Sequence, residues 1–480
     1  MPSATSRITP VQETLYNRCY SEARGVGLQG RASRNGATPG ALRREARLRR
    51  WQIRWHVRHC HGNLAIMRGN ASEPLRPNLL RWALDADFLG DRMSLIAGPR
   101  QIGKTTMVQA HLASVGHSSR YFNWDAPAVR SAWRRDPAFF ADGLVPGRAP
   151  VPVVFDELHK MPRWKNMLKG LHDEWRGRVR FVVTGSARLD FLRRSGDSLV
   201  GRYFLFRKLP LHPRECAASV ADVPGWLPTR PLEPSDSVPQ DFASACAALI
   251  ETTGFPEPFL SGSSQFRTRW QSEHLSLLLT EDLRDLTRIE QVLRLEDLVE
   301  LLRSRVGSTV STENLASNLS ASFGTVRRWL DALSLVYLTF DVPPFATRVA
   351  RAIRKQPKIY FWDWSIPDDP GARFENFIAV QLQRAIASWN ERGLGRFALA
   401  FVRTRDGVEC DFVVTDARRP VLLVEAKRND GEFAPSMFSV RRWLGGIPAV
   451  QVVERSGVLR PHAERDVWVM SADRFLLATP

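Results

Sequence analysis

Short apolar runs alternate with segments of helical spacing along the first half of the chain. Runs at 93–97, 151–155 and 178–186 have the length and composition of buried strands. Further strands are predicted at 120–125 and from 201 onward, and helical spacing lies between the runs at 75–89, 106–113, 128–134 and 189–199. Strands buried on both faces and separated by helices are typical of a parallel sheet. The pattern predicts an α/β fold with a doubly wound parallel sheet.

The first run leads into the sequence GPRQIGKTT at 98–106, which fits the pattern G-x-x-x-x-G-K-[ST]. Glycines let the backbone wrap around phosphate oxygens, the lysine reaches the terminal phosphates, and the next hydroxyl binds Mg²⁺. The expected nucleotide-binding residues are Gly98, Pro99, Arg100, Gln101, Ile102, Gly103, Lys104, Thr105 and Thr106. Thr105 is also an expected metal ligand. The alternative is a glycine-rich turn without a ligand.

The second run ends in two carboxylates, Asp156 and Glu157. An acid at the carboxyl end of such a strand holds Mg²⁺ beside a phosphate-binding loop. We expect Asp156 in that role and Glu157 as the residue that polarises the attacking water. A strand that ends in an acidic turn is the alternative.

Polar residues flank the next two strands. Thr184, or Ser186, would lie near the γ-phosphate as a sensor, or would cap the following helix. Arg202 would stabilise the transferred phosphoryl group from a neighbouring subunit, which implies a homo-oligomer. The alternative is an ordinary surface arginine.

Two helical modules are predicted after the sheet. A linker over 223–240 precedes helices at 242–250 and 266–289, whose leucines suit a lid packed on the first domain. Three short helices follow at 295–306, 312–319 and 323–335, and an apolar stretch at 336–340 completes a winged helix-turn-helix.

The last of the three helices would present Thr325, Arg327 and Arg328 outward, with Val326, Leu330 and Leu333 inward. Such arginines could meet phosphate or guanine in DNA. A module used only for packing or protein contact is the alternative. Basic residues after this helix would follow a DNA backbone or form a solvated loop; they are Arg348, Arg351, Arg354, Lys355 and Lys358.

The C-terminal third contains a second set of acids. Glu375 lies in a predicted helix, Asp411 lies in a strand at 408–414, and Glu425 and Lys427 share one face of a strand at 421–427. Glu375, Asp411 and Glu425 could bind a divalent metal, while Glu425 and Lys427 would be catalytic residues of a nuclease. The same spacing also arises by chance in hairpins.

Composition adds a basic bias and few other constraints. The formal charge is +18, and residues 1–66 contribute half of it, since they hold 12 Arg, no Lys and 3 Glu. A basic balance is compatible with DNA as a partner. No apolar run could span a membrane, and no hydrophobic segment follows the N-terminus, so we expect a cytoplasmic protein. The five cysteines are scattered, which argues against disulfides.

Residues 1–66 differ from the rest of the chain. They are rich in Arg, Gly and Ser and lack a sustained apolar period. We expect a disordered extension, or a start codon placed too far upstream with Met67 as the true start; a transit peptide is the alternative. A cluster of His56, His59, Cys60 and His61 has no second ligand group at a usual zinc spacing.

The motifs together resemble a known family. GPRQIGKTT at 98–106, FDELHK at 155–160, TGSAR at 184–188 and GRY at 201–203 are similar to the AAA-type P-loop ATPases of bacteria and archaea that carry a C-terminal domain of unknown function 4143. The resemblance covers about 75–453. It implies ATP rather than GTP as the nucleotide, Mg²⁺ as the metal, and a restriction-endonuclease-like C-terminal domain with Glu375, Asp411, Glu425 and Lys427 in the family's order.

The expected function is an ATP hydrolase that acts on DNA. The alternative is a nucleotide-gated switch whose C-terminal domain binds DNA or protein without cleaving it. The predicted domains are an extension at 1–66, the ATPase core at 67–222, the linker and lid at 223–294, the winged helix at 295–358 and the nuclease-like domain at 359–480.

Overall fold

The computed structural model describes residues 82–84, 86–144, 150–185, 199–220, 226–283, 292–346, 356–404, 406–429 and 431–480, all within one unit at 63–480. Several predictions lie outside these residues: those for 1–66, for the helix at 189–199, for Ser186 and for the basic residues between 348 and 355. Among the described helices, none combines the length and the apolar character needed to cross a membrane.

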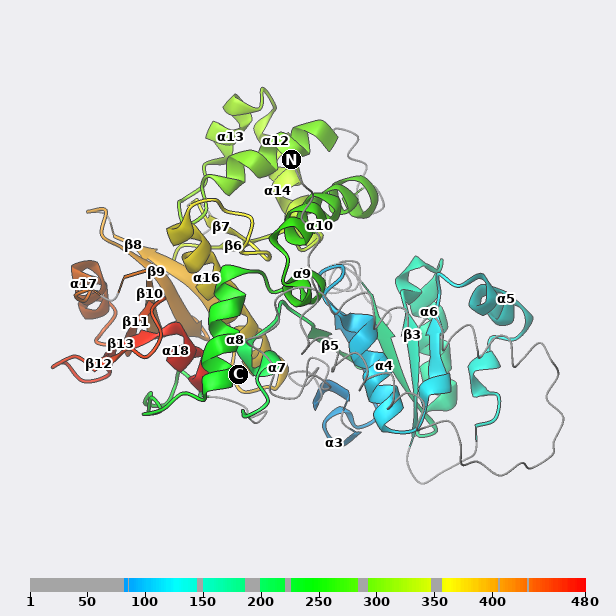
Figure 1. Ribbon diagram of the computed structural model, residues 1–480. Coiled ribbons are helices and arrows are strands. Elements are labelled where there is room, and N and C mark those ends of the chain that lie inside the picture. The colour runs from blue at the N-terminus through cyan, green and yellow to red at the C-terminus, as the bar shows by residue number, and fades with distance from the viewer. Residues whose placement is uncertain are drawn as a thin grey trace, which may run out of the picture. The chain divides into compact units, whose positions relative to one another are not determined.

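Five parallel strands form the first sheet, in the order β2-β3-β4-β1-β5. They are β1 (Met93–Ala97), β2 (Tyr121–Asn123), β3 (Val151–Asp156), β4 (Val179–Thr184) and β5 (Tyr203–Arg207). Neighbouring residues of one strand face opposite sides: Leu95 packs in the same core as α6 (Trp164–Trp175), and Ile96 in the same core as α4 (Lys104–Ser114). Helices therefore cover both faces, as the apolar runs predicted (Figure 1). The remaining helices of this region are α3 (Ala86–Leu89) and α5 (Pro127–Arg135).

A helical segment follows the first sheet. Its helices are α7 (Pro213–Cys216), α8 (Gln240–Glu251), α9 (Pro256–Ser261) and α10 (Ser264–Leu277). A π-helical turn, Leu278–Asp282, continues α10 without a break. The turn buries Leu278 and Leu279. The two helices predicted here are confirmed as far as Leu283, but the change to π-helical geometry was not predicted.

Three helices and a hairpin come next. They are α12 (Val292–Arg303), α13 (Thr312–Asn318), α14 (Phe323–Leu335), β6 (Thr339–Val342) and β7 (Lys358–Phe361). The strands β6 and β7 pair antiparallel, and Thr309 forms an additional bridge to Lys358. In α14, Val326, Leu330 and Leu333 are buried while Arg327 and Arg328 are exposed, as predicted.

Six strands form the C-terminal sheet, in the order β12-β13-β11-β10-β9-β8. They are β8 (Phe397–Arg403), β9 (Glu409–Asp416), β10 (Arg419–Lys427), β11 (Ala449–Val453), β12 (Leu459–Pro461) and β13 (Val467–Ser471). Helix α16 (Pro370–Glu391) covers one face and α17 (Pro435–Trp443) the other, and α18 (Ala472–Ala478) follows β13 (Figure 1). The predicted hairpin is β9-β10, in which Phe412 faces Val424.

Candidate functional site

The phosphate-binding loop occupies the carboxyl end of β1. Gly98 has a φ of 150°, and a Cβ added there would lie 2.1 Å from the Lys208 carbonyl oxygen, so only glycine fits. Gly103 has a φ of 88° and directly precedes α4. The two glycines therefore bring the loop close to β5 and turn it into the helix, as the motif requires.

Lys104 is folded against its own loop. Its Nζ donates to the carbonyl oxygens of Gly98, at 2.9 Å, and Pro99, at 2.6 Å. Burial lowers the pKa of Lys104 to about 8, although the carboxylates of Glu157 and Asp156 oppose that shift. Its hydrogen-bond partners are neutral, so the ammonium charge remains available to a phosphate.

Three hydroxyl groups hold Asp156 at the end of β3. Thr105 Oγ1 donates to Asp156 Oδ2 at 2.7 Å, Tyr121 OH donates to the same oxygen at 2.6 Å, and Thr184 Oγ1 donates to Oδ1. Burial raises the pKa of Tyr121, and its bond to Asp156 adds to that shift. Sequence reasoning missed Tyr121, although its strand is the parallel neighbour of β3.

The oxygen atoms of this cluster suit Mg²⁺. Magnesium prefers hard oxygen ligands and takes few of them from protein. The Thr105 hydroxyl and the Asp156 carboxylate come from different elements and lie 2.7 Å apart. The two residues that the sequence predicted as ligands are thus neighbours, and the residues present fit the metal.

Glu157 follows Asp156 in a left-handed conformation, with a φ of 57°. Its N–H donates to the Thr184 carbonyl oxygen at 3.0 Å, so the backbone at Glu157 still pairs with the end of β4. Burial raises the pKa of Glu157, while Lys160 and Lys104 oppose the shift. Lys160 Nζ lies 3.3 Å from Glu157 Oε2 and 2.6 Å from Asp125 Oδ2. Glu157 therefore has a basicity above that of a free carboxylate, which suits a residue that polarises water.

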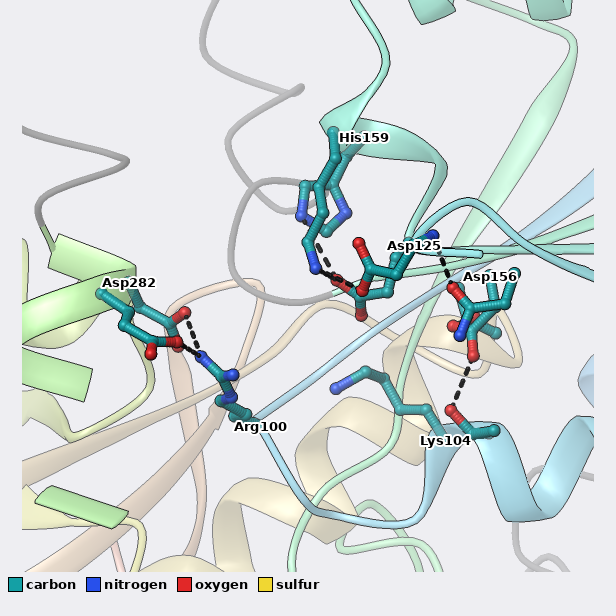
Figure 2. A network of polar contacts seen from close by, with 12 residues as sticks. Arg100, Lys104, Asp125, Asp156, His159 and Asp282 are labelled. Carbon is teal, nitrogen blue, oxygen red and sulfur yellow. Dashed lines mark hydrogen bonds and ion pairs between the residues drawn. The ribbon is translucent and has the colours of Figure 1, made fainter. Parts of the chain in front are cut away.

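The loop residues between the two glycines contact the helical segment. Arg100 Nη1 lies 3.1 Å from Glu281 Oε2 and 3.0 Å from Asp282 Oδ1, and in Figure 2 its guanidinium points towards Asp282. Ile102 is buried with Phe255 and Trp270. These loop positions were predicted as nucleotide-binding, and in this structure their side chains face Phe255, α10 and the π-helical turn.

His274 of α10 makes the third contact of this kind. Its Nδ1 lies 2.9 Å from Gln101 Oε1, and its ring stacks on Trp270 with the centroids 4.5 Å apart. Burial lowers the pKa of His274 to about 4, and the positive charges of Arg100 and Lys104 add to that shift. The imidazole is therefore neutral near pH 7, and its Nδ1–H can donate to Gln101.

Arg202 lies away from the loop of its own chain. It directly precedes β5, which runs parallel to β1 with Tyr203 beside Met93 and Arg207 beside Ala97. Arg202 therefore lies at the amino ends of the parallel strands, whereas Lys104 lies at their carboxyl ends. Its guanidinium binds both carboxylate oxygens of Asp173, at 2.8 and 3.0 Å. The finger role in a neighbouring subunit stays a prediction.

The C-terminal acids also come together. Lys427 Nζ lies 2.7 Å from Glu425 Oε1, and Glu425 Oε2 accepts from the Asp411 N–H at 3.1 Å. Glu375 approaches them from α16, and burial raises its pKa to about 7, with the Asp411 charge adding to the shift. The structure thus brings together the four residues predicted for this site.

Lys358 joins this cluster and corrects one prediction. We expected it to follow DNA or to lie in a solvated loop, but its side chain is only 1% exposed and lies among Glu375, Glu409 and Asp411. Burial alone would lower the pKa of Lys358, yet the facing carboxylates raise it above its ordinary value. Within the described residues, no group of three or more His, Cys, Asp and Glu side chains is arranged to hold a metal ion. The assignment of Glu375, Asp411 and Glu425 as metal ligands stays a prediction.

Two family models match parts of the chain, and the first match includes all five strands of the first sheet. Residues 90–217 match the family model described as an AAA domain, and residues 245–367 match the one described as Domain of unknown function (DUF8612). Uncharacterized proteins of Mycobacterium tuberculosis and Mycobacterium bovis are each 26% identical over 342 residues, which is 68% of this chain and 68% of the relative. The AAA match includes the loop, Asp156, Glu157, Thr184 and Arg202. The N-terminal half of the chain therefore contains a P-loop AAA domain, which indicates an ATPase.

Proposed function

We propose that this protein binds ATP with Mg²⁺ at residues 98–106 and hydrolyses it. The observation that carries the proposal is the arrangement of Lys104, Thr105, Asp156 and Glu157 at the ends of β1 and β3. A cationic group, a pair of oxygen ligands and a carboxylate of raised pKa are the parts that phosphoryl transfer to water needs. ATP in preference to GTP rests on the family resemblance.

Each residue has a separate role in this proposal. On nucleotide binding, the Lys104 ammonium would exchange its hydrogen bonds to two neutral carbonyl groups for contacts with the terminal phosphates. Hydrogen bonds to a charged acceptor are stronger than those to a neutral one. Thr105 and Asp156 hold Mg²⁺, which neutralises charge on the phosphate oxygens when bound. Glu157 accepts a hydrogen bond from the attacking water. Thr184 keeps Asp156 in place, so we assign it a positioning role rather than direct contact with the γ-phosphate.

The loop contacts suggest how nucleotide binding could change the position of the helical segment. Arg100, Gln101 and Ile102 each contact a residue of the helical segment: an acid, a histidine and an apolar cluster. Because Lys104 must give up its hydrogen bonds to Gly98 and Pro99 to reach a phosphate, we propose that the adjacent loop contacts change on binding. The π-helical turn is a feature often found at functional sites. We propose that the segment 240–283 acts as a lid that responds to ATP.

Action on DNA is the second candidate function. Its support is the exposed pair Arg327 and Arg328 on α14, next to the β6-β7 hairpin. We propose a winged helix-turn-helix for 292–361 and a restriction-endonuclease-like sheet after it, in keeping with the resemblance to the 4143-type ATPases. The burial of Lys358 among the acids favours a C-terminal domain that binds over one that cleaves. Assembly through Arg202 is part of the same proposal.

The variant Lys104→Ala tests nucleotide binding. Loss of charge-assisted hydrogen bonds should weaken ATP binding about 10- to 100-fold and abolish hydrolysis. Titration with a fluorescent ATP analogue and a phosphate-release assay measure the two effects. The matched control is Lys169→Ala on α6, which should leave both unchanged. Normal hydrolysis by Lys104→Ala would refute the proposed site.

A further inference from the structure

The carboxylate cluster of the C-terminal sheet encloses the ammonium group of Lys358. Lys358 Nζ lies 2.7 Å from Glu409 Oε1, 3.3 Å from Glu375 Oε1 and 3.5 Å from Asp411 Oδ1. These acids come from β9 and α16, while Lys358 comes from β7. The three elements therefore converge on one cation that the chain itself supplies.

The other sides of these acids are also engaged. Tyr360 OH donates to Glu375 Oε1 at 2.6 Å, and the Ala426 N–H donates to Asp411 Oδ2 at 3.0 Å. Glu425 is bound by Lys427 and by the Asp411 N–H. Each of the three predicted metal ligands thus has a protein donor already. Such full pairing is what buried charges require.

The strand geometry fixes Lys358 in this place. Its backbone pairs with Val342 of β6 and forms a bridge to Thr309 on its other side. The Phe401 ring centroid lies 5.6 Å from its Nζ. Withdrawal of the ammonium would leave the carboxylates of Glu375 and Asp411 without the cation that lies within 3.5 Å of each. Lys358 is therefore held in the cluster by its strand pairing and its burial, whereas a surface lysine would be free to move into solvent.

A divalent metal does not fit beside this lysine. Mg²⁺ needs near-octahedral oxygen ligands at about 2.0–2.1 Å. The ammonium already lies within 3.5 Å of an oxygen of each of Glu375, Glu409 and Asp411. A metal ion at this position would overlap the ammonium group and would be repelled by its positive charge. The described residues also offer no group of three or more acids, histidines or cysteines arranged for a metal.

We infer that Lys358 is the resident cation of this cluster and replaces the divalent metal that a nuclease site of this pattern would hold. The C-terminal sheet is then a metal-independent structural and binding module that does not cleave phosphodiester bonds. The inference is independent of ATP hydrolysis at the loop. It also explains how the sequence can contain all four residues predicted for a nuclease site while the site does not cleave DNA.

Mn²⁺ binding to the full chain tests this inference. Asp156→Asn is placed in every protein of the set, so that the loop contributes no metal site. Free Mn²⁺ is measured by electron paramagnetic resonance during titration without nucleotide. We expect no Mn²⁺ binding that depends on Asp411, and a gain of roughly a hundredfold or more in Mn²⁺ affinity when Lys358→Met is added. Lys358→Arg keeps the charge and should show no gain, and Lys169→Met is the matched control.

Two results would overturn the inference. One is Mn²⁺ binding by the Asp156→Asn protein that disappears when Asp411→Asn is added. The other is a Lys358→Met protein that is folded at the titration temperature and gains no Mn²⁺ affinity. If Lys358→Met does not fold, the comparison with Asp411→Asn decides the question alone. Supercoiled DNA incubated with the wild-type chain and Mn²⁺ should remain uncut; cutting that Asp411→Asn abolishes would also contradict the inference.

Discussion

The phosphate-binding loop and the C-terminal cluster each combine a buried lysine with acidic residues, but the lysines have different partners. Lys104 donates to the carbonyl oxygens of Gly98 and Pro99, and its acid, Asp156, is held by hydroxyl groups. Lys358 instead lies among the acids themselves. In the loop, both charges therefore remain available to a ligand. In the cluster, the ammonium is already engaged by three carboxylates of the chain.

The difference shows that residue types alone do not define a metal site. Both regions contain the acids and the lysine that their motifs require, at the required spacing. What separates them is whether the acid is held by neutral donors or by a cation. Neutral hydroxyl donors orient a carboxylate and leave its charge uncompensated. A buried ammonium orients it as well, but occupies the position beside its oxygens that a metal would take.

The largest expected effect is on ATP hydrolysis. Glu157→Gln removes the group that polarises water and should lower the hydrolysis rate about 100- to 10,000-fold, while ATP binding is retained. Steady-state phosphate release and equilibrium binding separate the two quantities. Glu174→Gln, on the exposed side of α6, is the matched control. A Glu157→Gln protein that hydrolyses ATP at the wild-type rate would place the catalytic carboxylate elsewhere.

The second prediction compares the two lysines directly. Lys358→Met removes one partner of a buried ionic cluster and should cost about 3–5 kcal/mol of local stability, because the acids are left without a counter-charge. Lys104→Met should cost less than about 2 kcal/mol, since only bonds to neutral carbonyls are lost. Hydrogen exchange of peptides from β7 and β9, and from α4, measures the two effects in buffer with a chelator. Equal losses at both lysines would contradict the distinction drawn between them.

Much of the fold followed from local pattern. The loop motif and the acids after β3 depend on neighbouring residues, and the helix predicted at 323–335 has the bounds of α14. Ser322 caps that helix by accepting from the Thr325 N–H, which is a signal visible in the sequence. The continuous apolar runs of β1 and β3 likewise predicted a sheet covered on both faces.

The site features that were missed depend on pairing across the chain. Lys358 looked like one member of a basic run, because nothing near it in sequence shows that β7 pairs with β6 and faces Glu375 and Asp411. Tyr121 contacts Asp156 only because two strands are adjacent in the sheet. The contacts of Arg100 span about 180 residues. Sequence spacing carries no information on which surfaces meet, so these roles needed the structure.

The smallest predicted effect is a pH dependence of stability at the contact between His274 and the phosphate-binding loop. The C-terminal cluster has no histidine in a comparable position among the residues named above. His274 is buried against Trp270 and bonds to Gln101, and its pKa is lowered to about 4. A histidine with a pKa near its usual 6.5 in the unfolded chain binds a proton there before it does in the fold. Stability should therefore fall as the pH drops below about 6.5, and continue to fall until about pH 4. Between pH 7.5 and 5.5 the loss from this group is about 1.3 kcal/mol.

His274→Gln should remove that part of the pH dependence, because glutamine does not titrate. Hydrogen exchange of α10 at the two pH values, corrected for the intrinsic exchange rate, gives the local opening free energy. His117→Gln is the matched control, since His117 lies outside this contact. An equal drop in the wild type and in His274→Gln would mean that another group drives the change. A drop confined to proteins with His274 would show that protonation of one side chain in α10 loosens its hold on the phosphate-binding loop.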